Sequence, residues 1–336
     1  MDKKAALAKL MPFQMAFLGS ACLYVVARLE IADKLNDGPK SSSELASATD
    51  ANEDMLYRVL RYLASEGIFE ERADRTFANN NTSELMRSDI EQSYQPFTIL
   101  NSERAFEAVN EMLGGVKSGE IPYVRRFGEH PFEAMHRDPE RAKLAERGWQ
   151  GVHGPETQAF LDAYDLSDIY CLADIGGGHG DVVVRFLESD PARKGVIFDI
   201  PQVAGQVEER IAAAGLADRC ESVGGNFFES VPVKADAYFL RHILHDWDDD
   251  ECRTILRNIA ASCEPGDRVL IAETVVKEPN VPDAGKLFDM MMMVFLSGKE
   301  RTEAEYRQLL EETGFEYVGL TPTDSIISVV EGRKKG

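Results

Sequence analysis

The stretch Asp174-Ile-Gly-Gly-Gly-His-Gly180 follows an apolar run, Tyr170–Ala173, and precedes a segment typical of a helix, Asp181–Glu188. A strand, a glycine turn and a helix in this order form a cradle for a nucleoside ligand. Glycine lets the backbone bend sharply and approach a ligand closely. The spacing is acid-x-G-x-G-x-G, whereas the dinucleotide fingerprint G-x-G-x-x-G would put its third glycine at Asp181. The loop therefore departs from the nicotinamide pattern.

A carboxylate closes the next apolar run. Val196-Ile-Phe-Asp199 lies about 20 residues beyond the glycine loop, where an acid can accept hydrogen bonds from both hydroxyls of a ribose. The alternative is an ordinary α/β turn with a solvated aspartate, because a glycine loop alone is a weak signal. Since loop and acid agree in spacing, the pattern favours the other adenosine ligand common on this fold, S-adenosylmethionine (SAM).

The composition indicates a globular protein of about two domains. The chain has 336 residues, of which 44% are hydrophobic and 28% charged. Its formal net charge of −21 repels phosphate backbones and anionic membranes, which argues against a nucleic-acid partner. The five cysteines form no C-x-x-C pair, so we expect reduced thiols in a cytoplasmic protein rather than disulfides or a zinc site.

The N-terminal segment resembles a signal peptide, because Lys3-Lys4 precedes the apolar run Met11–Val26. Gln14 and Ser20 interrupt that run and Arg28 closes it, which argues against export and against a membrane span. A helix that is apolar on most faces must be buried, and a terminal one is often buried in another subunit. We therefore expect residues 1–35 to form a homodimer interface.

Residues 41–80 have the outline of a winged helix. Ser41-x-x-Glu44 is a capping box for a short helix, Asn52 can cap a second helix, and 68–71 and 76–78 can pair as a hairpin. The two interpretations are DNA binding and a packing module used for dimerisation. The acidic chain favours the second.

Beyond residue 170 strands and helices alternate, which predicts a mostly parallel sheet covered on both faces. The last two strands have no helix between them, so we expect the final strand to be antiparallel. The fold class is thus α/β, with a Rossmann-like, seven-stranded domain over 96–336, including a mostly helical stretch to 168, and a helical, winged-helix-like domain over 1–95. The expected strands are 170–174, 195–199, 220–224, 236–240, 268–273, 316–320 and 325–330.

Two histidines follow the fourth strand, at a sheet end where ligands bind in such folds. His245 is the better candidate for a base, since it precedes an Asp-capped helix, and His242 is interpreted as a packed neighbour. The fifth strand ends at Glu273, and Glu300 follows an apolar segment. Either carboxylate can hold the Nδ1–H of a histidine and leave Nε2 free, although each can equally be a surface charge.

At this point the chain resembles the plant and bacterial small-molecule O-methyltransferases of the caffeic acid and hydroxyindole type. The resemblance extends over most of the chain, and its motifs keep their order and spacing across about 170–302. They are Ala173-Asp-Ile-Gly-Gly-Gly-His-Gly180, Phe198-Asp-Ile-Pro201, Gly224-Gly-Asn-Phe-Phe228, His245-Asp-Trp247, Ala272-Glu273 and Gly298-Lys-Glu-Arg-Thr302. This implies a class I methyltransferase domain with an N-terminal dimerisation domain.

The resemblance also implies roles for single residues. Asp174, Gly176 and Gly178 would lie against the methionine and ribose part of SAM, and Asp199 would hold the ribose hydroxyls. The adenine would lie between Asn226 and Phe227, with Arg241 near the cofactor, His245 as general base and Glu273 and Glu300 on either side of it. Two positions depart from the family pattern. Asn226 replaces an acid but can still accept from the adenine amino group, and Arg241 replaces a lysine with different donor geometry.

The implied reaction moves a methyl group from SAM to a hydroxyl of a small aromatic or polyketide-like metabolite, yields S-adenosylhomocysteine (SAH) and needs no metal. Met290, Met293 and Phe295 are expected to form part of an apolar wall for a flat acceptor, with Trp149 and His153 as weaker candidates. Part of the Met290–Met293 run must instead pack in the core. The alternatives are a relative that methylates nitrogen or carbon or does other chemistry, and a winged-helix regulator.

Overall fold

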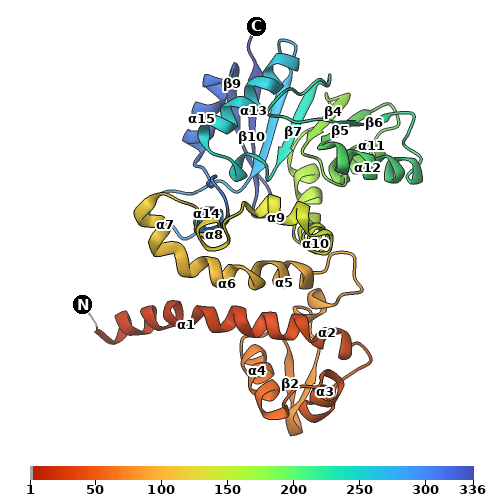
Figure 1. The fold of residues 1–336 in the computed structure, drawn as a ribbon. Coiled ribbons are helices and arrows are strands. Elements are labelled where there is room, and N and C mark those ends of the chain that lie inside the picture. The colour runs from red at the N-terminus through yellow and green to blue at the C-terminus, as the bar shows by residue number, and fades with distance from the viewer. Residues whose placement is uncertain (1–2) are drawn as a thin grey trace. The chain divides into compact units, whose positions relative to one another are not determined.

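The structure, a computed structural model, describes residues 3–336, apart from the side chain of His136. The chain forms two compact units, each described by itself below (Figure 1). The first comprises the described residues up to Asn110 together with Pro131–Gly154. The second comprises Glu111–His130 and Pro155–Gly336.

The first unit contains the helix, helix and hairpin that the sequence predicts. The Ser41 hydroxyl accepts from the backbone N–H of Glu44, and the Glu44 carboxylate accepts from the backbone N–H of Ser41, so the capping box is present. Asn52 caps the next helix through the N–H of Met55. A small sheet has the order β1-β3-β2, with β1 as a strand that the sequence did not indicate. The elements up to residue 86 are α1 Lys3–Arg28, α2 Ile31–Lys34, β1 Lys40–Ser41, α3 Ser42–Thr49, α4 Glu53–Ser65, β2 Glu70–Arg72, η1 Ala73–Arg75, β3 Thr76–Ala78 and η2 Ser83–Met86.

Further helices complete this unit and lead into the second one. Apolar side chains of α1, α2, α3 and α4 pack with Phe69, Phe77 and Ile99 in one core. The long helix α10 crosses from the first unit into the second near Pro155. These helices are α5 Gln95–Glu103, α6 Ala105–Ala108, η3 Val109–Glu111, α7 Met112–Ser118, α8 Pro122–Phe127, α9 Pro131–Arg137 and α10 Pro139–Ala163.

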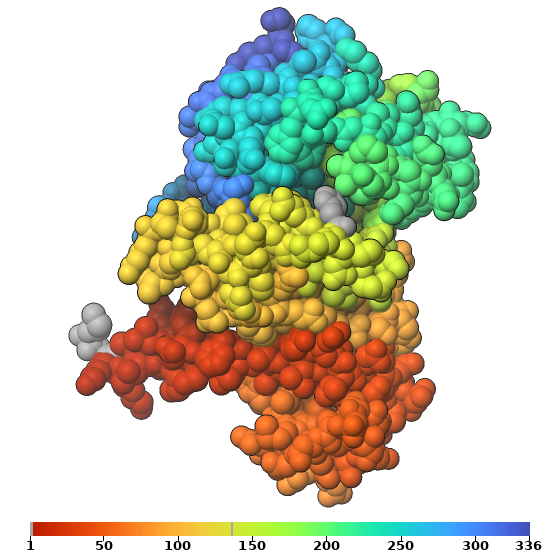
Figure 2. All heavy atoms as spheres, viewed as in Figure 1, coloured from red at the N-terminus to blue at the C-terminus, as the bar shows by residue number. Residues whose placement is uncertain are grey.

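Helix α1 exposes large apolar side chains along its first half. Figure 2 shows it in red along the surface of its unit, and Phe13 is 79% exposed. By length and composition α1 is the one helix among the described residues that could span a membrane. Gln14 and Ser20 therefore do not exclude a membrane span, contrary to the expectation from the sequence. Soluble core helices and signal sequences meet the same criterion. The other exposed residues are Leu7, Leu10, Met11, Met15, Phe17 and Leu18.

The second unit is built on the predicted seven-stranded sheet. Its order is β6-β5-β4-β7-β8-β10-β9. The five strands from β4 to β8 are parallel, and β10 is antiparallel to both of its neighbours. The expectation for the final strand is therefore confirmed. The strands are β4 Cys171–Ile175, β5 Lys194–Asp199, β6 Cys220–Gly224, β7 Ala237–Arg241, β8 Arg268–Glu273, β9 Phe315–Pro322 and β10 Ser328–Lys334.

Two buried clusters cover the two faces of this sheet. Alternate residues of β7 illustrate the period of two, because Tyr238 and Leu240 lie in one cluster and Phe239 in the other. Helices α13 and α15 contribute to the first cluster, and α11, α12 and the end of α10 to the second (Figure 1). The sheet is thus fixed from both sides, and its carboxyl ends carry the loops described next. The helices are α11 Asp181–Glu188, α12 Pro201–Ala213, η4 Leu244–Asp246, α13 Asp249–Ser262, α14 Ala284–Phe295 and α15 Glu303–Glu312.

Candidate active site

The glycine loop joins β4 to α11. Gly176, Gly178 and Gly180 all have positive φ angles, of 74°, 52° and 76°, which side chains rarely adopt. A Cβ on Gly176 would lie 2.4 Å from Cδ1 of Ile243, so this glycine is needed for close packing. A Cβ on Gly178 would meet nothing within 4 Å. The backbone at Gly178 therefore borders open space, as a ligand cradle requires.

Asp199 ends β5 beside this loop. One carboxylate oxygen accepts from the backbone N–H of Gly178 at 2.8 Å, and the other accepts from that of Ile200 at 2.7 Å. Burial raises the pKa of Asp199, and these two hydrogen bonds oppose that rise. Each oxygen keeps a further lone pair, so the carboxylate can also accept from a pair of vicinal hydroxyls.

Asp174 lies under the loop at the end of β4 and is 4% exposed. Burial raises its pKa to about 7, against the opposing charge of Arg241 and with Asp199 and Asp181 adding to the rise. Arg241 ends β7 and donates to the Thr157 hydroxyl at 2.7 Å. The assignment of Asp174 to the cofactor site stays a prediction.

Asn226 and Phe227 follow β6. The Asn226 side-chain oxygen accepts from the backbone N–H of Phe228 at 3.0 Å and so shapes its own turn. Phe227 and Phe228 contact each other edge to face at 4.8 Å between ring centroids, and Phe228 contacts Trp247 in the same way at 4.8 Å. The described loop, acid and aromatic groups fit an adenosine ligand, because they combine open backbone, a diol acceptor and apolar ring surface.

His245 lies in the turn η4, between β7 and α13. Its Nδ1 is 2.8 Å from Oε1 of Glu300, and its Nε2 is 3.4 Å from Oδ1 of Asp246. The imidazole and the Glu300 carboxylate are both buried. With Glu300 accepting at Nδ1, the neutral form of the imidazole has its proton at Nδ1 and its lone pair at Nε2.

Glu273 contacts the backbone of the His245 turn. Its side chain is fully buried, and its hydrogen bonds among the described residues go to backbone N–H groups and a tyrosine rather than to the imidazole. Oε1 accepts from three successive backbone N–H groups, those of Ile243, Leu244 and His245, at 3.1, 2.6 and 3.3 Å. Its other oxygen accepts from the Tyr306 hydroxyl. The sequence left open which glutamate is nearer to the imidazole, and in the structure it is Glu300.

The carboxylates around His245 change its acidity. Burial alone would lower the pKa of His245. The larger opposing effect comes from the negative charges of Asp246, Glu273 and Glu300 and from the Glu300 hydrogen bond, and the net result is a pKa raised to about 9. Burial raises the pKa of Asp246 to about 7, and the charge of His245 opposes that rise. Imidazole and carboxylate therefore stabilise each other's charged form.

The expected wall residues are on α14. Met292 is buried in the core, as at least part of the run had to be, whereas Met290 is exposed and Met293 is half-buried. Phe295 packs against Tyr123 of α8 with ring centroids 5.8 Å apart. The weaker candidates, Trp149 and His153, are on the part of α10 that belongs to the first unit, and their assignment to an acceptor site stays a prediction.

Sequence reasoning missed several residues at this site. Arg301 is fully buried and donates to carbonyls of the His245 turn, although it stands inside a motif already noted. Tyr306 follows the helical period of α15 and carried no other signal. His242 contacts the buried Glu156 through Nε2 at 2.8 Å, and its ring centroid is 5.0 Å from that of His245. The sequence had treated His242 only as a packed neighbour.

Comparison with known families identifies the chain. An O-methyltransferase domain matches residues 106–316, and an O-methyltransferase dimerisation domain matches residues 11–89. The chain belongs to the O-methyltransferase family. It is accordingly a SAM-dependent methyltransferase with a Rossmann-like domain, and it carries the family's dimerisation domain, which includes most of α1.

Three similar proteins illustrate the range of the family. Phenazine O-methyltransferase PhzM from Lysobacter antibioticus is 38% identical over 93% of this chain and 91% of its own length. The 8-amino-8-demethylriboflavin N,N-dimethyltransferase from Streptomyces davaonensis is 31% identical over 93% and 90%. The structure of CalO1, a methyltransferase in calicheamicin biosynthesis solved with SAH bound, matches with a TM-score of 0.89, 29% identity and 99% coverage of both chains.

We predict that Asp199→Ala weakens SAM binding by at least about tenfold, because it removes an acceptor for two ribose hydroxyls and hydrogen bonds to a charged group contribute about 1.5–3 kcal/mol each. Isothermal titration calorimetry with SAM measures this. Asp218→Ala is the control, since Asp218 is exposed in a turn of the same unit. Unchanged affinity in Asp199→Ala would remove this residue from the cofactor site.

Proposed function

We propose that this enzyme methylates a hydroxyl group of a small aromatic or polyketide-like metabolite, with His245 as general base. The observation that carries the proposal is the hydrogen bond between Nδ1 of His245 and Glu300, which in the neutral imidazole puts the lone pair at Nε2, where it can take a proton from the acceptor. The phenazine O-methyltransferase relative supports an aromatic acceptor.

Bound SAM supplies an activated methyl group on a sulfonium centre. The protein then has to hold the acceptor oxygen in line with that methyl carbon, and such positioning can contribute about 7–11 kcal/mol. In the proposed mechanism His245 takes the hydroxyl proton at Nε2 as the oxygen attacks, and Glu300 stabilises the resulting imidazolium through Nδ1. Glu273 acts on the backbone of the turn and so holds His245 in place. Met290, Met293 and Phe295 would form the apolar side of the acceptor site.

Nitrogen methylation is the competing function, because one relative is an N,N-dimethyltransferase. A neutral amine is nucleophilic enough to attack without first losing a proton, whereas a neutral hydroxyl is a much weaker nucleophile, so the His245–Glu300 pair favours a hydroxyl acceptor. Incubation with methyl-labelled SAM and a panel of phenols, aminophenols and anilines, followed by mass spectrometry of the products, tests the proposal. Label found only on nitrogen would overturn it.

We further propose a cytoplasmic homodimer in which α1 supplies much of the interface. The exposed apolar side chains of its first half support this, since patches of that kind on soluble proteins mark interaction sites. The matched dimerisation domain begins at residue 11, within the same helix. A second copy of the chain is therefore a better occupant of this surface than a membrane.

We predict that His245→Ala retains SAM binding and loses at least about 10²-fold in turnover on a phenol of ordinary pKa, the usual contribution of a general base. The loss should be smaller for an acceptor that is already ionised, because no proton then has to be removed. His242→Ala is the control and should have a much smaller effect. Wild-type turnover in His245→Ala would contradict the acid–base mechanism.

The pH dependence of the reaction should follow the pKa of His245. A base acts only when unprotonated, so kcat/KM should rise with pH until about 9, where the carboxylates hold this pKa. Asp246→Asn removes the largest of the raising influences, and the inflection should therefore move to lower pH. Initial rates with a phenol that stays neutral to about pH 10 measure this. Asp250→Asn, whose side chain is 95% exposed, should leave the inflection in place.

We predict a dimer at micromolar concentration by analytical ultracentrifugation. Replacing Phe13 and Phe17 with glutamate should shift the protein towards the monomer, because charges would then have to be buried at the interface. Lys9→Glu changes an exposed charge on the same helix and is the control. A monomeric wild-type protein would refute the proposal.

A further inference from the structure

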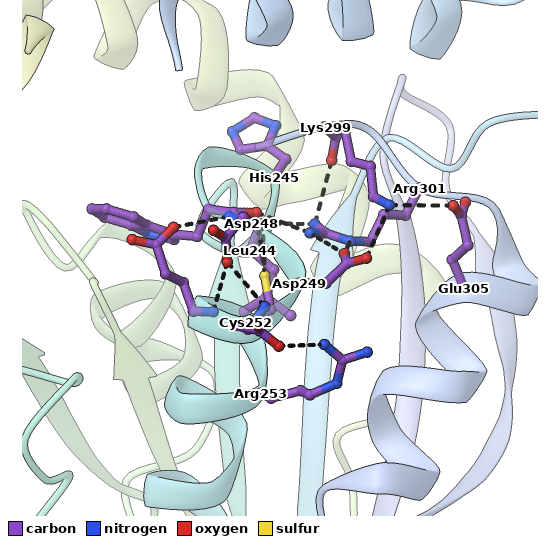
Figure 3. A network of polar contacts seen from close by, with 12 residues as sticks. Leu244, His245, Asp248, Asp249, Cys252, Arg253, Lys299, Arg301 and Glu305 are labelled. Atoms are coloured by element: carbon purple, nitrogen blue, oxygen red, sulfur yellow. Dashed lines mark hydrogen bonds and ion pairs between the residues drawn. The ribbon is translucent and has the colours of Figure 1, made fainter. Parts of the chain in front are cut away.

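Arg301 is one of the largest fully buried side chains among the described residues, and its guanidinium lies beside the His245 turn (Figure 3). Its burial is complete, with an exposed fraction of 0%. A buried guanidinium is costly to desolvate, so its hydrogen bonds have to be well made. Nη1 donates to the carbonyls of Leu244 at 2.8 Å and Lys299 at 3.3 Å, Nη2 to the carbonyl of Trp247 at 2.9 Å and to Asp249 at 2.9 Å, and Nε to Asp249 at 3.1 Å.

These acceptors bracket the proposed base. The carbonyls of Leu244 and Trp247 lie on either side of the His245–Asp246 pair in the sequence, so one guanidinium joins both ends of the turn. On its own segment Arg301 directly follows Glu300, whose carboxylate is the partner of Nδ1. Arg301 therefore connects the two segments that form the His245–Glu300 hydrogen bond.

The two segments are in direct contact elsewhere as well. A Cβ on Gly298 would lie 1.9 Å from the carbonyl oxygen of His245, so no other residue fits there without movement of the backbone. Lys299 contacts Asp249 and Glu305 at 3.1 and 3.6 Å, at the outer side of the same network (Figure 3). The segment 298–301 thus contacts the turn at Gly298, Glu300 and Arg301.

A purely stabilising role explains this arrangement poorly. Replacing a buried ion pair with apolar groups of similar volume is often neutral or stabilising, so stability alone does not require a charge in this place. The Asp249 side chain, which is the charged partner of Arg301, is 40% exposed, so solvent screens this ion pair and reduces its contribution to stability. What a planar guanidinium provides is several donors in a fixed arrangement, which can set the separation of two loops.

We propose that Arg301 is a positioning residue that holds the His245 turn and the Glu300 segment at the separation needed for the hydrogen bond between Nδ1 and Glu300. The proposal rests on His245 being the base of the proposed function. Glu273 supports the turn independently through its backbone N–H groups, so loss of Arg301 should loosen the pair without releasing the turn.

The sign of one measurable quantity separates positioning from charge. If Arg301 acted only through its positive charge, removing it would favour the imidazolium and raise the pKa of His245. If it positions Glu300, removing it weakens the hydrogen bond that favours the imidazolium and lowers that pKa. The other groups around the pair stay the same in both cases: Asp246 and Glu273 near His245, the His242 ring 5.0 Å away, and Asp289 near Glu300.

The test uses the full-length protein with Arg301→Gln, Arg301→Lys and Asp249→Asn. Arg301→Lys keeps the positive charge but loses the planar set of donors. Asp249→Asn weakens the ion pair of Arg301 from the side of its half-exposed partner, and it replaces the Arg301 variants in the test if those do not fold. Lys299→Met is the matched control, because it removes a cation that binds the same Asp249 carboxylate. Among the described contacts, the Lys299 side chain does not touch the His245 turn. Arg253→Gln is a second control, on the outer side of α13.

The first measurement is the pKa of His245 by NMR of the imidazole nitrogens, assigned with His245→Ala. It needs no acceptor and no turnover. We expect the pKa to fall by about one unit in Arg301→Gln, by less in Arg301→Lys and Asp249→Asn, and to stay unchanged in Lys299→Met and Arg253→Gln. A rise in folded Arg301→Gln, or no change in any of the three test variants, would overturn the proposal.

The second measurement is turnover with labelled SAM on 2-naphthol and on a nitro-substituted naphthol that is ionised at neutral pH. Arg301→Gln should lose about tenfold on 2-naphthol and less than twofold on the ionised acceptor, with unchanged SAM affinity. Equal losses on both acceptors would mean general structural damage and would also overturn the proposal. The same assay with His245→Ala tests the base separately: full turnover there refutes the proposed function, whereas the NMR result still decides whether Arg301 positions Glu300.

Discussion

A single buried carboxylate, that of Glu273, determines the shape of the loop that follows β7. Three successive N–H groups of residues 243–245 point at one of its oxygens, and without that acceptor they would have to be satisfied elsewhere in a water-poor interior. The second oxygen is held by Tyr306 from α15, so the carboxylate cannot turn away. The orientation of His245 follows from this arrangement of backbone N–H groups.

The turn is supported from two directions by chemically different means. Glu273 accepts from its N–H groups, and Arg301 donates to its carbonyls at residues 244 and 247. A backbone segment with both kinds of polar group satisfied has little freedom to rearrange. A side chain on such a segment is preorganised, which is the property that catalysis by positioning requires.

The features that the sequence predicted are those encoded locally. The alternation of strands and helices, the capping box at Ser41 and the spacing of the glycine loop to Asp199 depend on neighbours in the chain, and the described structure contains them. The roles of Glu273 and Glu300 could not be separated in the same way. Both are acids that end or follow apolar segments, and only tertiary packing decides that one meets backbone N–H groups and the other an imidazole. Arg301 was missed for the same reason, because a buried arginine looks like a surface arginine in the sequence.

The turn after β7 also connects the base with the cofactor loop. The side chain of Ile243 packs so closely on Gly176 that a Cβ there would lie 2.4 Å from its Cδ1. Two residues further on, His245 contacts Glu300. A displacement of this short segment would therefore change the cradle and the base together. Methyl transfer requires oxygen, carbon and sulfur in line, and a rigid segment of a few residues that touches both halves of the site is a direct way to maintain that alignment.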